Sequence, residues 1–480
     1  MKEKFFKNIK ILFLVIYSLF SIGLLVAPLK YSHSIKFIIL YIIIFSLFII
    51  FIKLKNIINN LLHKKNITKI IFISVIFIGI LIRVLLLCVN YSELTGVSDY
   101  QTFFSNSATF CESNKIFQKT YVELFPFLIP YMVLLGSFFK IASISYKSVV
   151  LLNIILDLLT ALFLYFSFNN KNIKMILPCF WLLNPINCIW CTICCPVVAV
   201  NFGIVLSIFA FSKVLKHINS KLFILYSIIT GVIMGFANMF RPIMPIMLIA
   251  ILLYYIFINL KQKNLNVNYI LSFLLITISL LCVKSLGTFT LNKIINGNVS
   301  TTSGWTLYIG SNLESNGMWY SEKKLDEFLS SGLSPEETQQ KFKDLAIERY
   351  KSNGINNVKL FKNKFFVLTE QTSEYSFGTF LSICQPSNLI AHIIKLSLHL
   401  FVFLLTLLNA LNVYLDIKYK NSDIQDLFYM LLYIGLVMAH LFVEVSPRYY
   451  MPAIVPLTII SGLSLYKFLT ITEKGEIKND

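Results

Sequence analysis

Apolar runs long enough to cross a membrane recur along most of the chain. A transmembrane helix needs about 20 predominantly apolar residues to span the hydrocarbon core of a bilayer. Twelve runs approach or reach that length: 11–28, 36–53, 67–89, 148–168, 173–190, 196–212, 221–239, 243–260, 268–288, 388–415, 425–443 and 450–470. A thirteenth run, 122–142, contains Pro126 and Pro130 and is ambiguous. The pattern predicts an all-α polytopic membrane protein with about 12 transmembrane helices.

The composition excludes the soluble classes of protein. The 480 residues are 57% hydrophobic and 14% charged, whereas a soluble domain has about 45–50% apolar and 25% charged residues. The net charge is +19, from 42 Lys and Arg against 23 Asp and Glu. We attribute this excess to membrane sidedness, because Lys and Arg gather in cytoplasmic loops. We therefore expect the lipid bilayer as a partner, and no nucleic acid.

The distribution of lysines orients the chain. If the N-terminus is cytoplasmic and 122–142 does not cross, the inside loops hold most of the loop lysines, including Lys55, Lys171, Lys216 and Lys418. If 122–142 crossed, every later loop would invert and these lysines would face outward. We predict a multi-pass protein of the cell (plasma) membrane with cytoplasmic N- and C-termini, and 122–142 as a re-entrant or juxtamembrane helix.

This topology divides the chain into four regions. Residues 1–66 are two extra N-terminal transmembrane helices, and 67–288 are a transmembrane core with a first outer loop at 90–147. Residues 289–387 form one large extracytoplasmic loop with short helices, and 388–480 hold the C-terminal transmembrane helices and a cytoplasmic tail.

Within the large loop, a capping motif marks the start of a helix. Ser334 is followed by proline and two glutamates, the pattern of a capping box with proline at the first helical position. Gly354 is a typical helix end. We predict a helix from this motif to about Asn353.

The candidate catalytic acid is Asp99, in the first outer loop just beyond the third apolar run. A carboxylate at the membrane–water boundary can serve as a general base or hold a cation. Its alternative is an ordinary solvated acid. Glu112 and Glu123 are the next nearest acids and rank second.

Arginine is rare here, with four residues against 38 lysines. Its planar fork grips phosphate as lysine cannot. Arg448 and Arg241 lie in short outer turns, so both are candidates for binding a lipid phosphate; an interface anchor is the alternative for Arg448. Arg83 lies near the outer end of a span, where snorkelling explains it. Asp157 lies in mid-span, where a function and a helix–helix hydrogen bond are both open.

Aromatic residues between glycines open the large loop. Trp305 and Tyr308 are followed by Asn312. Such residues can stack on a sugar ring and hydrogen-bond to it, or they can pack the loop onto the bundle. Both interpretations stay open.

A cysteine cluster has spacing that suggests zinc but lacks the second half of a site. Its members are Cys188, Cys191, Cys194 and Cys195. Cysteine is also a common apolar residue in spans. We predict no metal-binding residues and no definite cofactor, and we leave a divalent cation as the open alternative.

Several short motifs follow one another along the chain on the predicted outer side of the membrane. They are Ser98-Asp99-Tyr100, Phe125-Pro126, Leu183-Asn184-Pro185, Phe240-Arg241-Pro242, Gly304-Trp305-Thr306-Leu307-Tyr308-Ile309-Gly310 and Pro447-Arg448-Tyr449. Over roughly 67–465 this order resembles the GT-C superfamily of membrane glycosyltransferases, specifically bacterial relatives of the dolichyl-phosphate-mannose–protein mannosyltransferases. The first two spans are additional to the resemblance.

The resemblance implies an enzyme of the hexosyltransferase type. It would move a sugar from a polyprenyl-phosphate donor to an extracytoplasmic acceptor, which is a cell-envelope glycan, a lipid or a protein. It also implies that Asp99 is the catalytic acid of the first loop, with sugar or acceptor contacts at Tyr100, Trp305, Tyr308 and Asn312. Many relatives carry an acid in the second outer loop, where this chain reads Cys194-Cys195-Pro196.

The mechanism that these residues favour is inverting transfer. Asp99 would take the proton of the acceptor, and Arg448 with Arg241 would stabilise the departing phosphate. Three other functions remain open. One is a flippase or other transporter of lipid-linked glycans, one is a polysaccharide polymerase or ligase, and one is a membrane scaffold.

Overall fold

A computed structural model describes residues 10–21, 23, 35–62, 65–89, 91, 98–116, 119–262, 266–321, 323–370, 372–419 and 425–470. Within these ranges every regular element is a helix. Eight of the described helices are long and apolar enough to cross a bilayer, or nine if the bent pair α9–α10 is one span. The chain is therefore an all-helical, multi-pass membrane protein, as predicted.

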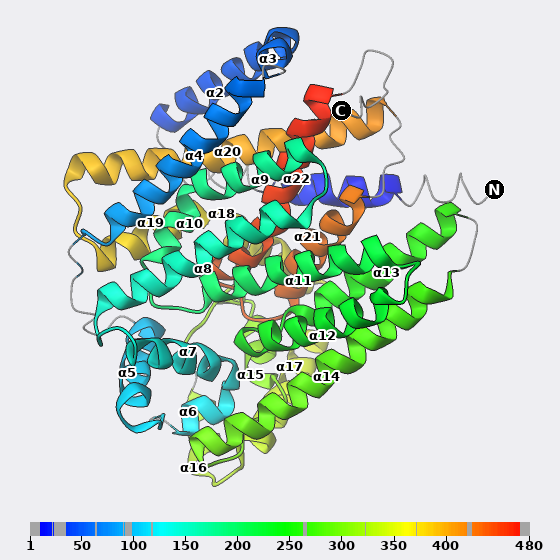
Figure 1. The fold of residues 1–480 in the computed structure, drawn as a ribbon. Helices are drawn as coiled ribbons and strands as arrows, with labels where there is room; N and C mark the ends of the chain where they lie inside the picture. The colour runs from blue at the N-terminus through cyan, green and yellow to red at the C-terminus, as the bar shows by residue number, and fades with distance from the viewer. Residues whose placement is uncertain are drawn as a thin grey trace.

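The long apolar helices form most of the bundle in Figure 1. They are α4 (Lys65–Leu86), α8 (Tyr146–Ser167), α11 (Val197–His217), α12 (Leu222–Phe240), α13 (Met244–Gln262), α14 (Val267–Ile295), α20 (Asn388–Lys418) and α22 (Met451–Thr470), which follows the short 3-10 helix η2 (Pro447–Tyr450). The other predicted spans correspond to shorter apolar helices: Lys10–Ser21, Ile38–Lys53 within α2 (Ile35–Lys53), and Asp426–Phe442 within α21 (Gln425–Phe442). A short helix, α3 (Lys55–Leu62), follows α2. The number of twelve spans stays a prediction.

The predicted span 173–190 is broken into two helices. Residues Lys171–Leu183 form α9 and Pro185–Cys191 form α10, with a bend of 57° between them. The residue before a proline avoids helical backbone angles, and Asn184 has φ −70° and ψ 110°. Its side chain accepts a hydrogen bond from the backbone N–H of Ile186 and so caps the new helix. The predicted span is therefore bent at Asn184, and its crossing of the membrane stays a prediction.

The ambiguous run 122–142 folds as three short helices. They are α6 (Lys119–Leu124), η1 (Pro126–Leu128) and α7 (Ile129–Phe139). Eleven residues of α7 extend about 16 Å, which is too short for a bilayer core of about 30 Å. Helix α7 packs against α5 (Ser98–Ser113), where a Cβ on Gly136 would lie 2.6 Å from the carbonyl oxygen of Ser107. The length of α7 fits a segment that does not cross.

The region 289–387 is a set of short helices, and α14 extends into it as far as Ile295. The others are α15 (Gly304–Gly310), α16 (Lys323–Ser330), α17 (Pro335–Asn353), α18 (Asn356–Glu370) and α19 (Thr372–Ile383). The capping box is confirmed: Ser334 Oγ accepts from the N–H of Glu337 at 3.3 Å, and Glu337 Oε2 accepts from the N–H of Ser334 at 2.9 Å. Helices α15–α17 lie with α5–α7 at the lower end in Figure 1, far from the end of α22.

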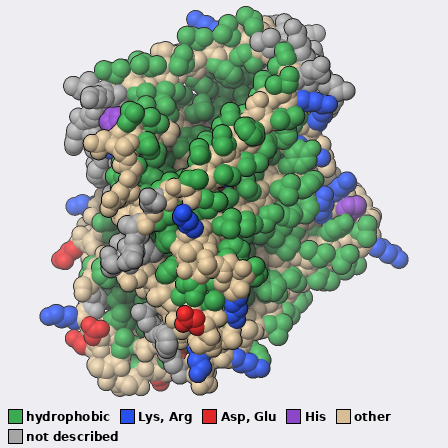
Figure 2. Space-filling model, turned by 60° about the vertical axis from the view of Figure 1, so that its left-hand side comes forward, with side chains coloured by type: hydrophobic (Ala, Val, Ile, Leu, Met, Phe, Trp, Pro, Cys, Tyr) green, Lys and Arg blue, Asp and Glu red, His purple; other side chains and the backbone are tan. Residues whose placement is uncertain are grey.

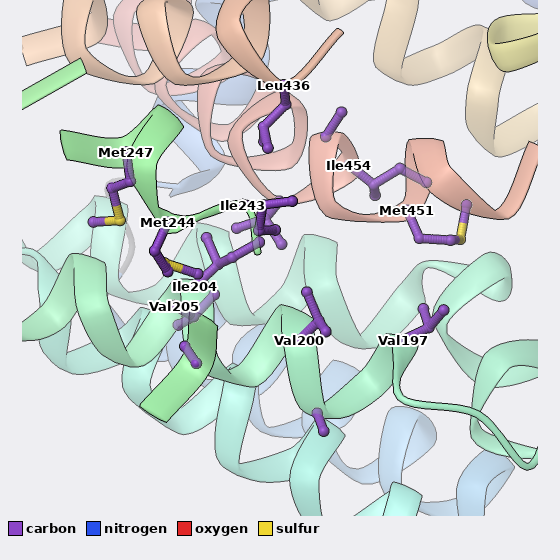
Figure 3. Close-up of a cluster of buried hydrophobic side chains, with 14 of the residues drawn as sticks. Val197, Val200, Ile204, Val205, Ile243, Met244, Met247, Leu436, Met451 and Ile454 are labelled. Carbon is purple, nitrogen blue, oxygen red and sulfur yellow. The ribbon is translucent and has the colours of Figure 1, made fainter. Parts of the chain in front are cut away.

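The buried core extends to the start of α22, the helix that follows η2. Figure 3 shows Val200 and Ile204 of α11 beside Met244 of α13, with Leu436 of α21 and Ile454 of α22 above them. All five side chains are buried. Well-packed interiors tolerate little displacement, so this cluster holds the start of α22 in place. Over the face drawn in Figure 2, hydrophobic side chains cover the middle and acidic ones gather toward the lower end.

Charged residues are buried in pairs inside the bundle. Arg83 Nε donates to Asp157 Oδ2 at 2.6 Å, and Trp181 Nε1 donates to Oδ1 at 2.8 Å. The side chain of Arg83 has 0% exposure, so the snorkelling interpretation was wrong. In the last turn of α22, Lys467 contacts Asp426 and lies 3.1 Å from Asp416 Oδ1. Removing one partner of such a buried pair is strongly destabilising.

Candidate functional site

The structure brings Asp99 and Arg448 together, although 349 residues separate them. Arg448 Nη2 donates to Asp99 Oδ2 at 2.7 Å. The side chains are 26% and 22% exposed for Asp99 and Arg448 respectively. A charge-assisted contact of this length is among the stronger hydrogen bonds. Partial exposure leaves both groups open to a ligand.

Local sequence explains where the two groups stand. Asp99 lies in the first turn of α5, where the helix dipole favours an acid. Arg448 lies in η2, which has Pro447 at its first position and extended Ser446 before it. The proline starts the turn and the core behind η2 anchors it. Both residues therefore stand on helix starts, not on unsupported loops.

Arg241 joins the same site through Tyr449. Its guanidinium lies 4.1 Å from the centroid of the Tyr449 ring, and that of Arg448 lies 5.4 Å from it. Arg241 follows α12 directly, in extended conformation. Burial lowers the pKa of Arg241 to about 10, so the group is still charged at neutral pH. The two predicted phosphate-binding arginines thus flank one tyrosine.

Glu444 is a second carboxylate at this site, and sequence reasoning missed its role. It accepts a hydrogen bond from the Tyr449 hydroxyl at 3.2 Å and is 7% exposed. Burial raises its pKa, while Arg448 and the Tyr449 hydroxyl oppose the rise. Glu444 lies four residues after His440, but α21 ends at Phe442, so the two do not share a helix face. His440 Nδ1 instead lies 2.6 Å from the Leu436 carbonyl oxygen.

Tyrosines surround the ion pair. The Tyr121 hydroxyl donates to Asp99 Oδ1 at 3.3 Å, and the Tyr100 hydroxyl lies 3.3 Å from that of Tyr375 on α19. Trp190 stacks on Tyr375 with 6.5 Å between ring centroids. Burial raises the pKa of Tyr121, so the phenol keeps its proton and donates. Tyr100 is 3% exposed, so its ring is part of the buried packing around the site.

The second-rank acids lie elsewhere. Glu112 is exposed near the end of α5, about 20 Å from Asp99 by the rise of a helix. Glu123 lies on α6 two residues after Tyr121, and residues two apart on a helix face different directions. Its backbone carbonyl accepts from the N–H of Ser300 at 2.8 Å. Asp99 is therefore the acid that the structure sets beside Arg448.

The predicted sugar contacts of α15 are engaged in packing, the alternative that the sequence left open. The rings of Trp305 and Tyr308 lie 4.8 and 5.2 Å from that of Phe342 on α17. Both are buried, at 5% and 1% exposure. The Asn312 side chain accepts from the N–H of Glu314 at 2.8 Å and so closes a turn.

This packed unit supports the loop that carries the site. The N–H of Glu444 donates to the Thr306 carbonyl at 2.6 Å, and the N–H of Val445 donates to that of Gly317 at 2.8 Å. The aromatic motif thus fixes the segment that leads to Arg448.

Cys195 lies close to the site. Burial raises the pKa of its thiol to about 12, and the charges of Arg448, Arg241 and Asp99 also act on it. Among the described residues, no three His, Cys, Asp or Glu side chains are grouped to hold a metal ion. The four clustered cysteines are buried free thiols.

Comparison with known protein families and with curated proteins found no match to this chain.

Proposed function

We propose that this protein is an integral membrane glycosyltransferase that uses a polyprenyl-phosphate-linked sugar as donor. The observation that carries the proposal is the convergence of Asp99, Arg448 and Arg241 at one end of an apolar bundle. A base beside two guanidinium groups suits a reaction in which a hydroxyl is deprotonated and a phosphate departs. The phosphate of a lipid-linked donor lies at the membrane surface, which is the depth at which the apolar helices meet the polar segments.

The reaction would proceed by inversion. The acceptor hydroxyl oxygen attacks the anomeric carbon and its proton passes to Asp99. The bond between that carbon and the phosphate oxygen breaks, and its electron pair stays on the phosphate. The phosphate gains one negative charge, which Arg448 and Arg241 stabilise. Residues stabilising charge that develops only in the transition state raise the rate itself.

The ion pair in the structure has a place in this cycle. Arg448 Nη2 donates to Asp99 Oδ2, so this oxygen is occupied in the absence of donor. A donor phosphate that shares Arg448 draws the guanidinium away from Asp99. Donor binding would then leave Asp99 Oδ2 open to the acceptor hydroxyl.

A transporter of lipid-linked glycans is the second candidate, favoured by the charges buried inside the bundle. Transport pathways commonly use intramembrane acids and bases. Here, however, Arg83 pairs with Asp157, and Lys467 with Asp416 and Asp426. The polymerase or ligase alternative would use Arg349 of the 289–387 region, whose guanidinium stacks on Tyr308 at 3.9 Å. That stacking assigns Arg349 to packing.

The test is transfer by the purified protein in liposomes. Polyprenyl-phosphate sugars labelled in the hexose are supplied with extracts of cell-envelope glycans, lipids and proteins as acceptors. We expect release of polyprenyl phosphate together with labelled acceptor of opposite anomeric configuration. Movement of intact donor across the bilayer without release of polyprenyl phosphate would establish the transporter in its place.

A further inference from the structure

Glu444 lies near enough to Arg448 and Arg241 to feel their charges, but among the described residues it forms an ion pair with neither. In the described part of the chain, Arg448 pairs with Asp99, and Arg241 lies over the Tyr449 ring. The polar contact of the Glu444 carboxyl is with the Tyr449 hydroxyl, at 3.2 Å. An unpaired ionised carboxylate is costly to bury, and such a group takes up a proton instead.

We infer that Glu444 is a positioning residue that carries a proton in the working enzyme, which leaves the two arginines free to hold one phosphate anion. The inference rests on the proposed function and deepens it, because it sets the charge that the donor must bring. A phosphodiester-linked sugar, with one negative charge, is the class of donor that fits.

The charges balance through the reaction on this assignment. With Glu444 neutral, Arg448 and Arg241 bring two positive charges, and Asp99 and the donor phosphodiester bring one negative charge each. After transfer, Asp99 holds the proton of the acceptor and is neutral, while the released phosphate monoester carries two negative charges. The site is neutral before and after transfer. An ionised Glu444 would add a negative charge beside the phosphate at both stages, and only a charged Lys364 would offset it.

Other titratable groups face Glu444 and have to be separated from it. Burial is the largest influence on the pKa of Glu444 and raises it. The charge of Asp99 raises this pKa as well, whereas the charges of Arg448 and Arg241 lower it. Lys364 on α18 donates to the Gly310 carbonyl at 2.9 Å, and burial lowers its pKa to about 7. Loss of that lysine's charge would also weaken anion binding as pH rises. His440, on α21, lies near Tyr449, with 5.8 Å between ring centroids.

The experiment measures binding of methyl farnesyl phosphate, a diester whose single charge is constant between about pH 5 and 9, to the full-length protein in nanodiscs. Affinity should be high where Glu444 is protonated and should fall as pH rises through its pKa, by up to about tenfold per pH unit because one proton is involved. Glu444→Gln keeps the shape and cannot ionise, so its affinity should not fall with pH. Lys364→Met is the matched control and should keep the decline, moved to higher pH because the lysine no longer favours ionised Glu444.

A second variant tests the same point without altering Glu444. The Tyr449 hydroxyl stabilises the ionised form of Glu444, so Tyr449→Phe should move the decline in affinity to higher pH. An equal decline in wild type and Glu444→Gln would overturn the assignment, as would a decline that disappears only in Lys364→Met. No binding of the probe at any pH, with no transfer in liposomes, would instead overturn the proposed function itself.

Discussion

Asp99 is held by one guanidinium and one phenol, yet a quarter of its side chain is exposed. We expect Asp99→Asn to lower the rate of sugar transfer by about 10²–10⁴-fold, the usual contribution of a general base. The amide keeps the shape and loses the base, so donor binding should be retained. Transfer rate and donor affinity are measured separately in liposomes.

Glu112→Gln is the matched control, because this acid lies on the same helix at its exposed far end. It should leave transfer unchanged. Full transfer by Asp99→Asn, with a loss in Glu123→Gln, would move the base to α6. If none of the three substitutions alters transfer, the enzyme interpretation itself fails.

Arg448 is proposed to grip phosphate through a planar fork, a property that lysine lacks. Arg448→Lys keeps the charge, so we expect transfer to fall by about ten- to a hundredfold, the equivalent of a charged hydrogen bond of about 1.5–3 kcal/mol. Donor affinity, measured as in the binding experiment, should fall with it. Unchanged donor affinity in Arg448→Ala would reduce the residue to an interface anchor.

The sequence predicted part of this site for a simple reason. Arg241 and Arg448 stood out because arginine is rare in this chain, and Asp99 because it follows the third apolar run closely. Glu444 was missed because its surroundings come from Thr306 and Gly317, more than a hundred residues earlier. The aromatic residues of α15 could not be assigned, because a ring that binds sugar and a ring that packs a loop look alike in sequence.

Helix α15 and the loop before η2 touch through a glycine. A Cβ on Gly310 would lie 2.3 Å from the carbonyl carbon of Val443 and 2.7 Å from the nitrogen of Glu444. Gly310→Ala should therefore destabilise the protein by about 1–3 kcal/mol, the usual effect of overpacking. The displaced loop should also lower donor affinity. Thermal unfolding in detergent and probe binding measure the two effects.

Gly378 of α19 provides the comparison, since a Cβ there meets no atom within 4 Å. Gly378→Ala should stabilise the protein by about 0.5–1 kcal/mol, because alanine restricts the unfolded chain. Equal effects at the two glycines would mean that the close contact of Gly310 has no consequence for the site.

Elements were predictable where local chemistry decides them. The capping box at Ser334 and the glycine at position 354 bound α17 as predicted. The bend after α9 also has a local cause in Asn184 and Pro185. Hydrophobicity averaged along the run hid that cause, since both arms of the bend are apolar. Proline alone does not decide such a break, because Pro178 and Pro456 lie inside the continuous helices α9 and α22.

The orientation of the whole molecule in the membrane follows from its lysines and can be tested by labelling. Lys216 and Ser331 are both exposed. We substitute each with cysteine in a background that lacks the exposed Cys88 and Cys282. A membrane-impermeant thiol reagent on intact cells should label position 331 and spare position 216. The opposite pattern would mean that 122–142 crosses and that the site faces the cytoplasm.

The buried charges around Lys467 have a consequence for how the protein is made. Lys10, in the first described helix, forms an ion pair with Asp416 at 3.8 Å, and Lys467 completes the cluster from the last helix. At a synthesis rate of about 5–20 residues per second, Asp416 is made roughly 20–80 s after Lys10. Until then the first helix lacks its contact with α20, although Phe257 of α13, which packs on Phe13, is already made. Chains arrested before α22 contain Asp416 but lack Lys467, so we expect them to form a weaker crosslink between the first helix and α20 than the full-length chain does.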